Sequence, residues 1–127
     1  MGANIPSPDG QSVLYVWQDP ENLANPVHFS IVPSKGGAAT YTFDRMVGGG
    51  IVNWAPDGKS LDYLVTRGGV TNVWRQSLSG GAPKQFTHFT SDLAQTFIWS
   101  GDGKTLAIAR GTRTADIVLL KSPTKQQ

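Results

Sequence analysis

Three aspartates with regular spacing are the residues of this 127-residue chain whose type most suggests chemistry. Asp9, Asp57 and Asp102 each precede a glycine and lie 48 and then 45 residues apart. Carboxylates brought together in one site can act as general acids and bases. The Asp-Gly dipeptide also favours two-residue hairpin turns, because both residues tolerate positive φ better than most. We therefore interpret the three aspartates as turn formers and expect no catalytic residue among them.

The two histidines, His28 and His88, are the other candidates for acid–base or metal chemistry. They fall in different repeats, and neither stands in a Gly-x-Ser-x-Gly or a His-Glu-x-x-His motif. A zinc site needs three or four good ligands, and the chain has no cysteine. We expect no metal site and no cofactor, and we expect both histidines to be structural or solvent-facing. The glycine run at 48–50 lacks the Lys-Ser/Thr of a nucleotide loop and predicts a bulge or turn.

The aspartates belong to a repeat that extends beyond the turn. The Ser-Pro-Asp-Gly sequence of residues 7–10 returns as Ala-Pro-Asp-Gly at 55–58 and as Ser-Gly-Asp-Gly at 100–103. A period of this length is typical of architectures whose repeats pack against one another. Trp54 and Trp99 precede the second and third copies and are the predicted packing residues between repeats. The predicted structural turn motif comprises Pro8, Asp9, Gly10, Pro56, Asp57, Gly58, Asp102 and Gly103.

Short runs of β-branched, aromatic and aliphatic residues surround each turn and predict strands. No window of 11 or more residues has the apolar spacing of an amphipathic helix, and one helical turn at most is expected, over 91–95. Each period therefore holds about four strands in roughly 45 residues, the size of a β-propeller blade. We predict an all-β fold of about three blades of four antiparallel strands. The expected strands cover 13–17, 27–32, 39–43, 50–54, 61–65, 73–78, 84–88, 96–99, 106–109 and 116–121.

One blade is expected to be complete and two are expected to be partial. Pro6 replaces the aromatic residue in the first repeat, and few residues precede it, so its innermost strand should be missing or stunted. The third repeat should lack its outermost strand, because its last apolar run ends at Lys121 and a polar tail follows. We expect a single partial propeller domain over 1–127, with blades at about 1–43, 44–88 and 89–121 and a tail at 122–127.

The repeated segments resemble the TolB-like β-propeller repeats, in which an aromatic residue, Ser-Pro-Asp-Gly-Lys and an apolar strand follow one another. WAPDGKSLDYLV and WSGDGKTLAIA are close to this pattern, SPDGQSVLYV is close after its first residue, and ADIVLLK resembles the last strand of such an array. These repeats occur in periplasmic TolB, in prolyl-oligopeptidase-type peptidases and in arrays attached to bacterial serine/threonine kinases. The resemblance implies a bacterial protein- or peptide-binding scaffold with a central channel, without a catalytic motif, in the periplasm.

Composition excludes several classes of function. The net charge is +2, from 11 basic and 9 acidic residues without a basic cluster, so we expect no nucleic-acid binding. The lack of cysteine excludes disulfides and thiol nucleophiles. No apolar run reaches the roughly 18 residues of a membrane-spanning helix, and no signal-peptide pattern is present, so we expect no membrane insertion.

A closed ring of four blades would need about 180 residues, which is more than this chain has. Open sheet edges and blade faces, with Ile108 and Ile117 near the final edge, should therefore be covered by another chain. Two copies would make a six-bladed ring with two-fold symmetry. We predict a non-enzymatic scaffold that binds a protein or peptide or assembles with itself as a homodimer. The alternative is an accessory or substrate-gating propeller of a larger peptidase or bacterial serine/threonine kinase.

Overall fold

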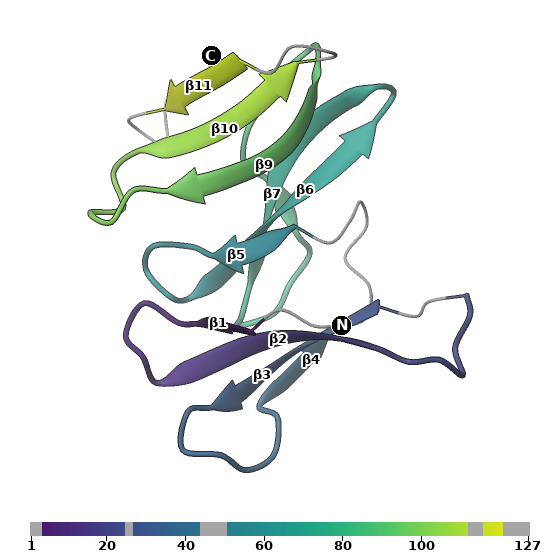
Figure 1. Ribbon diagram of the computed structural model, residues 1–127, viewed down its shortest axis with the longest axis vertical. Helices are drawn as coiled ribbons and strands as arrows, with labels where there is room; N and C mark the ends of the chain where they lie inside the picture. Colours follow the sequence, from purple (N-terminus) through teal and green to yellow (C-terminus); the bar gives the residue numbers. More distant parts are fainter. Residues whose placement is uncertain (1–3, 25–26, 44–50, 112–115, 121–127) are drawn as a thin grey trace. The chain divides into compact units, whose positions relative to one another are not determined.

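The computed structural model describes residues 4–24, 27–43, 51–111 and 116–120, and in these ranges it contains strands and no helix (Figure 1). The chain divides into two compact units, residues 1–47 and 48–127. The strands are β1 (Asn4–Pro6), β2 (Ser12–Gln18), β3 (Val27–Pro33), β4 (Tyr41–Phe43), β5 (Val52–Trp54), β6 (Ser60–Arg67), β7 (Val70–Ser77), β8 (Lys84–Gln85), β9 (Leu93–Trp99), β10 (Leu106–Gly111) and β11 (Asp116–Leu120).

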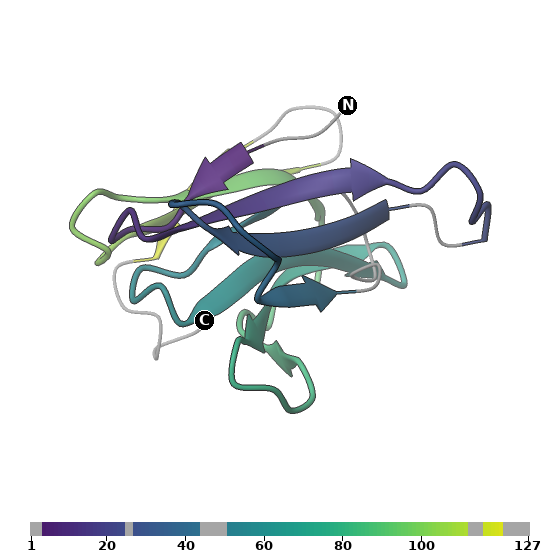
Figure 2. The ribbon, with the colours of Figure 1, turned by 90° about the horizontal axis from the view of Figure 1, so that it is seen from below.

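The first unit holds one antiparallel sheet, which we call the first sheet, in the order β1-β2-β3-β4 (Figure 2). Its β2 strand places Leu14 beside Ile31 of β3, and these two residues and Phe29 are buried on one face of the sheet. The innermost strand was expected to be missing or stunted. This expectation is corrected, because β1 is present, pairs with β2, and has three residues like the matching β5. Proline is tolerated there because β1 is an edge strand.

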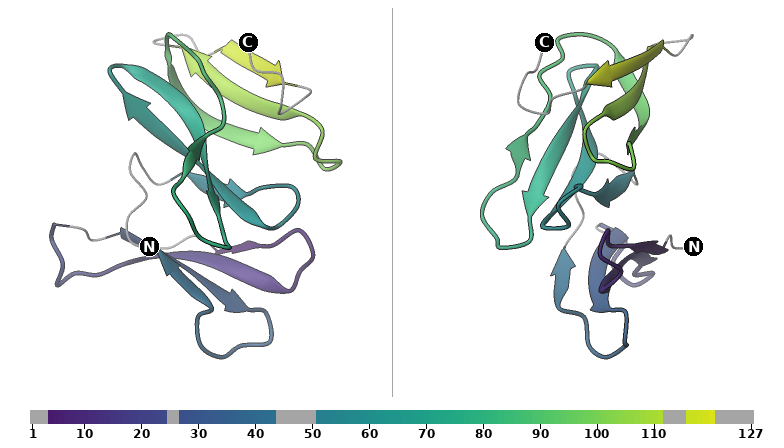
Figure 3. Two further views of the ribbon diagram at one scale, coloured as in Figure 1. Left: turned by 180° about the vertical axis from the view of Figure 1, so that it is seen from behind. Right: turned by 90° about the vertical axis from the view of Figure 1, so that its left-hand side faces the viewer.

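The second unit holds two stacked antiparallel sheets (Figure 3). We call β5-β6-β7-β8 the second sheet and β11-β10-β9 the third sheet. Gly68 and Gly69, at φ 57° and 78°, form the two-residue turn between β6 and β7. Positive φ at both central positions suits the twist of a hairpin and favours glycine. The third sheet has three strands in the described part of the chain, as the sequence predicted for the last repeat.

The core of the second unit lies between its two sheets. Leu64 and Val73 of the second sheet are buried against Phe97, Leu106 and Ile108 of the third sheet. Ile108 was expected near an exposed edge, and this expectation is wrong, because its side chain is fully buried. Alternate residues of a strand point to opposite faces, so Ile108 shares its face with Leu106. The side chain of Ile117 lies outside the described part of the structure, as do residues 48–50.

The Asp-Gly segments differ from the expected two-residue hairpins. In each one the glycine N–H donates to the carbonyl oxygen three residues earlier, over 2.9 Å; the pairs are Gly10 with Ser7, Gly58 with Ala55, and Gly103 with Ser100. Only the glycines have positive φ, at 70–72°. Aspartate therefore occupies the centre of an ordinary β-turn, and glycine follows it in the left-handed region, which has little steric cost for glycine. No helix in the described residues is long and apolar enough to cross a membrane.

Candidate functional site

The side chains of the predicted turn aspartates stabilise their own turns. Asp9 Oδ1 accepts hydrogen bonds from Ser7 Oγ, at 2.6 Å, and from the backbone N–H of Gln11, at 2.9 Å. The serine hydroxyl, followed by the Gln11 N–H, lowers the pKa of the Asp9 carboxyl below its ordinary value. Both donors favour the charged carboxylate. The Asp9 carboxylate therefore stabilises its own exposed turn.

The other two turns repeat this geometry with one difference. Asp102 Oδ1 accepts from Ser100 Oγ at 2.6 Å and from Lys104 N–H at 3.0 Å, and the Ser100 hydroxyl, followed by that N–H, lowers the pKa of Asp102. Asp57 accepts the Lys59 N–H at 2.9 Å, but alanine stands where the other turns have serine. The described residues contain no group of three acidic or histidine side chains that could hold a metal ion.

The predicted packing tryptophans occupy different environments. Trp54 ends β5 and is 5% exposed, whereas Trp99 ends β9 and is half-buried. Trp99 Nε1 donates to Asp62 Oδ2 of the second sheet over 3.0 Å. Tyr63 lies on the same face of the second sheet as Trp54. Burial raises the pKa of the Tyr63 hydroxyl, and the positive charge of Arg67 partly opposes this rise. Trp54 and Trp99 therefore match in the sequence repeat but differ in burial. Trp99 contacts the neighbouring second sheet by donating a hydrogen bond to the Asp62 carboxylate.

Asp62 is the centre of an ion pair that the sequence analysis did not identify. It is fully buried and accepts two bonds from Arg75, from Nε at 2.6 Å and from the terminal nitrogen at 3.0 Å. Arg75 also lies over the Phe86 ring, 4.0 Å from its centre. A buried carboxylate needs such partners to remain charged. The available signal was a charged residue inside the apolar run LDYLV, which calls for a buried partner.

The two histidines lie in separate places. His28 is buried in the first sheet and stacks on Trp17, with ring centres 4.6 Å apart. Trp17 Nε1 donates to Ser30 Oγ over 3.0 Å. His88 is exposed and follows β8 in the second unit, outside any strand.

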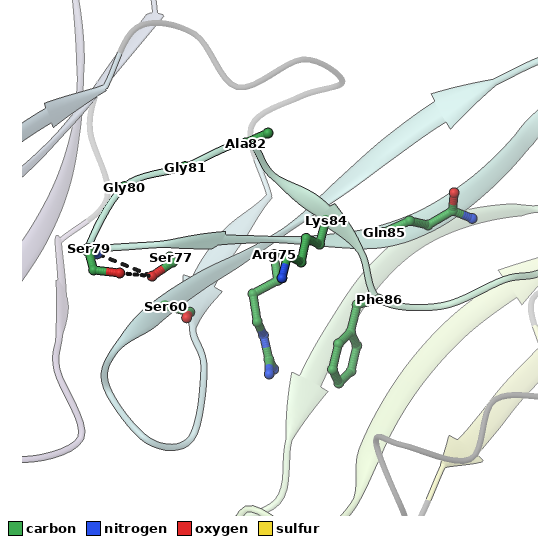
Figure 4. Close-up of a pocket in the computed structure, with 10 residues that line it drawn as sticks. All are labelled: Ser60, Arg75, Ser77, Ser79, Gly80, Gly81, Ala82, Lys84, Gln85 and Phe86. Carbon is green, nitrogen blue, oxygen red and sulfur yellow. Dashed lines mark hydrogen bonds between the residues drawn. The ribbon is translucent and has the colours of Figure 1, made fainter.

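A pocket of about 550 Å³ lies beside the β7–β8 hairpin of the second unit (Figure 4). Arg75 and Lys84 lie opposite each other on β7 and β8, and both line the pocket. Its other walls are Ser60, Ser77, Ser79, Gly80, Gly81, Ala82, Gln85 and Phe86. These residues include no aspartate or glutamate. The wall is therefore cationic and rich in hydrogen-bond donors, a chemistry that suits anions.

The third sheet also presents an open apolar face, formed by Ile98, Ala107, Ala109 and Leu119. The strand register brings Ile98 and Leu119 to either side of Ala107. Ile98 is 62% exposed and Leu119 is 60% exposed. On the second sheet the matching positions hold Asn53, Asp62 and Arg75, and the third sheet packs against that face.

Two curated proteins are similar in sequence to this chain. Tricorn protease homolog 1 of Streptomyces coelicolor is 30% identical over 105 residues, which are 83% of this chain and 9% of that protein. Dipeptidyl-peptidase 5 of Porphyromonas gingivalis is 29% identical over 92 residues, which are 69% of this chain and 13% of that protein. The chain thus spans only a small part of the curated relatives that it matches. No protein-family model matches the chain.

Solved structures share the fold. TolB from Acinetobacter baumannii matches 93% of the chain at TM-score 0.60 and 22% identity, over 28% of its own length. A prolyl endopeptidase matches the whole chain at TM-score 0.69 and 21% identity, over 21% of its length. The β-propeller domain of the Trilobed protease from Pyrococcus furiosus matches 92% at TM-score 0.57 and 17% identity, over 38% of its length. The three sheets of this chain therefore have the fold of TolB-like β-propeller repeats.

Proposed function

We propose that the chain is a non-enzymatic β-propeller scaffold whose blades complete a ring with those of a second copy. The open apolar face of the third sheet carries this proposal. Its two large side chains, Ile98 and Leu119, are about three-fifths exposed. Burying one such side chain against another surface stabilises the contact by roughly 2 kcal/mol. A blade face with this chemistry is suited to packing against another sheet.

The first sheet offers a matching surface. The residues by which the third sheet packs on the second include Leu106 and Ile108, which are buried. Their counterparts in the first sheet, by the sequence repeat, are Val13 and Tyr15, and both are only half-buried. The first sheet therefore has an incompletely covered face at the position where a blade normally meets the preceding one.

The polar groups on the open face of the third sheet and on this face of the first sheet also suit a contact between them. Where the third sheet packs on the second, the Trp99 N–H needs an acceptor and Asp62 supplies it. The first sheet has Pro6 in place of this tryptophan, and the indole of Trp17 on the same face already donates to Ser30 Oγ. The open face has Ala107 in place of Asp62 and so offers no carboxylate acceptor. A contact between these faces leaves neither an unpaired indole nor an unpaired carboxylate buried.

Two copies, each with three sheets, then give a six-bladed ring with two-fold symmetry, in which each third sheet meets the partner's first sheet. Complementation between two variants tests this pairing. Leu119→Asp and Tyr15→Asp should each abolish association, because each places a charge in both contacts of the ring. A mixture of the two variants should regain one intact contact and form a mixed pair, detected by native mass spectrometry with one variant isotopically labelled.

Leu23→Asp is the matched control, since Leu23 is exposed on a loop outside these faces. It should leave association unchanged. Association of Tyr15→Asp with itself would mean that third sheets pair with each other, and that result would contradict the proposed arrangement. Full association of Leu119→Asp would show that the open face is not part of the interface.

The names of the two relatives favour a second candidate function, an accessory propeller of a larger peptidase. In that case the open face is covered by another blade of the same polypeptide rather than by a second copy. Sequencing the encoding reading frame in both directions tests this candidate. A contiguous peptidase domain would support it, whereas stop codons bounding these 127 residues would exclude it.

A further inference from the structure

We propose that the pocket beside the β7–β8 hairpin binds a carboxylate, supplied by the C-terminus of a peptide or by a free organic acid. The pocket is formed within the second unit alone. The inference is therefore independent of ring closure and of the number of copies in the particle.

The charges around the pocket leave one cation without a partner. Arg75 and Lys84 are direct neighbours on adjacent strands, an arrangement that is unfavourable for like charges. Asp62 neutralises Arg75 through two hydrogen bonds. In the described part of the chain no carboxylate forms an ion pair with Lys84, which is exposed. A bound anion would relieve the repulsion between the two cations.

The arginine is held in place before any ligand arrives. Asp62 fixes one edge of the guanidinium, and the Phe86 ring lies 4.0 Å from its central carbon. Guanidinium has five N–H donors, and Asp62 takes two of them. Arg75 thus retains donors for a ligand, and little side-chain freedom remains to be lost on binding.

A hydroxyl group adds a further donor to the wall. Ser60 lines the pocket and is only 9% exposed, and within the described residues its hydroxyl has no hydrogen-bond partner. Figure 4 shows its hydroxyl on the same side of the hairpin as Arg75. Ser77 and Ser79 instead bond to each other over 2.7 Å. Ser60 is therefore the hydroxyl most available to a ligand.

The charge and size of the pocket favour a carboxylate over a phosphate. A single uncompensated cation matches a monoanion, whereas a phosphate group brings up to two negative charges and more strongly hydrated oxygens. A volume of about 550 Å³ exceeds the needs of a lone anion and falls within the range of small-molecule sites. Phe86 and Ala82 supply apolar wall for the body of the ligand.

Titration followed by amide NMR tests the proposal with four probes. These are acetyl-Ala-Phe, its C-terminal amide, 3-phenylpropionate and inorganic phosphate. We expect saturable shifts at Lys84, Gln85 and Phe86 with one or both carboxylates. The peptide and the free acid distinguish the two sources of the carboxylate. Equal binding of the peptide amide, tighter binding of phosphate, or no saturable shift with either carboxylate would overturn the proposal.

Substitutions assign the binding to named groups. Lys84→Gln should lower the affinity for the carboxylate about tenfold, and Ser60→Ala should lower it about threefold. Lys104→Gln is the control, because it removes the same charge from an exposed turn of the third sheet. Tryptophan fluorescence checks that each variant is folded. Equal affinities of Lys84→Gln and Lys104→Gln would contradict the assignment.

Discussion

The second and third sheets of the second unit share one backbone plan but differ in the chemistry of the same face. On the second sheet this face carries the Asp62–Arg75 ion pair, and the third sheet covers it. On the third sheet the matching positions are Ala107 and Leu119, and the face is open. A covered face can hold a buried carboxylate because the neighbouring sheet and strand complete its hydrogen bonds. The open face uses apolar side chains, which any suitably shaped sheet can cover.

Breaking the ion pair should have the largest effect on the second sheet. Asp62→Ala leaves Arg75 and the Trp99 N–H without their acceptor, and should lower the free energy of unfolding by about 3 kcal/mol. This is the lower end for a buried pair, because the Arg75 side chain is 26% exposed. Urea denaturation measures the loss. Ala107→Ser at the matching open position should change stability by less than about 0.5 kcal/mol. Equal losses for both would remove the contrast between the faces.

The contact from Trp99 to Asp62 should have the next largest effect. Trp99→Phe keeps an aromatic ring but removes the N–H bond to a charged acceptor, at a cost of about 2 kcal/mol. Trp74→Phe provides the control, because Trp74 stacks under Arg67 and donates no indole bond among the described residues. It should cost less than about 1 kcal/mol. Thermal unfolding of both variants gives the difference, and no difference would show that the indole bond contributes little.

Two turns of the same sequence pattern should respond differently to alanine. Gly10 and Gly103 have the same φ of 72°. A side chain at Gly10 would meet nothing within 4 Å, so Gly10→Ala should cost only the strain of the left-handed backbone, about 1 kcal/mol. At Gly103 a Cβ would lie 2.8 Å from the Pro56 Cβ, so Gly103→Ala should cost about 1 kcal/mol more. Denaturant midpoints that agree for the two variants would refute this difference.

The smallest effect concerns the Ser100 hydroxyl. This group lowers the pKa of Asp102 in the folded chain below its ordinary value of 3.8. The interaction therefore stabilises the fold fully above pH 3.8, and this stabilisation is lost as the pH falls through the lowered pKa. Ser100→Ala should raise the pKa of Asp102 toward 3.8. An NMR titration of the carboxyl carbons measures this, with Asp9 as an internal control. An unchanged pKa of Asp102 would exclude the hydroxyl as the main cause.

Local sequence signals were sufficient to predict the repeat and every strand except β1, which contains Pro6. Turn residues and β-branched runs act within a few positions of one another, and each expected strand run overlaps an observed strand. The ion pair was missed because Arg75 lies 13 positions from Asp62 and Trp99 lies 37 positions away, so only the packed sheets unite them. The pocket depends on the register that sets Arg75 beside Lys84. Ile108 was misplaced because a strand's alternation defines two faces but not which one a neighbouring sheet covers.

The mass of the particle in solution tests most directly the proposal that a second copy covers the open face. Sedimentation equilibrium over a range of micromolar concentrations gives this mass without reference to shape. Ring closure by two copies predicts twice the chain mass of 13.6 kDa, with no larger species as concentration rises. A particle of 13.6 kDa throughout would contradict ring closure between copies and leave the open face for another polypeptide to cover.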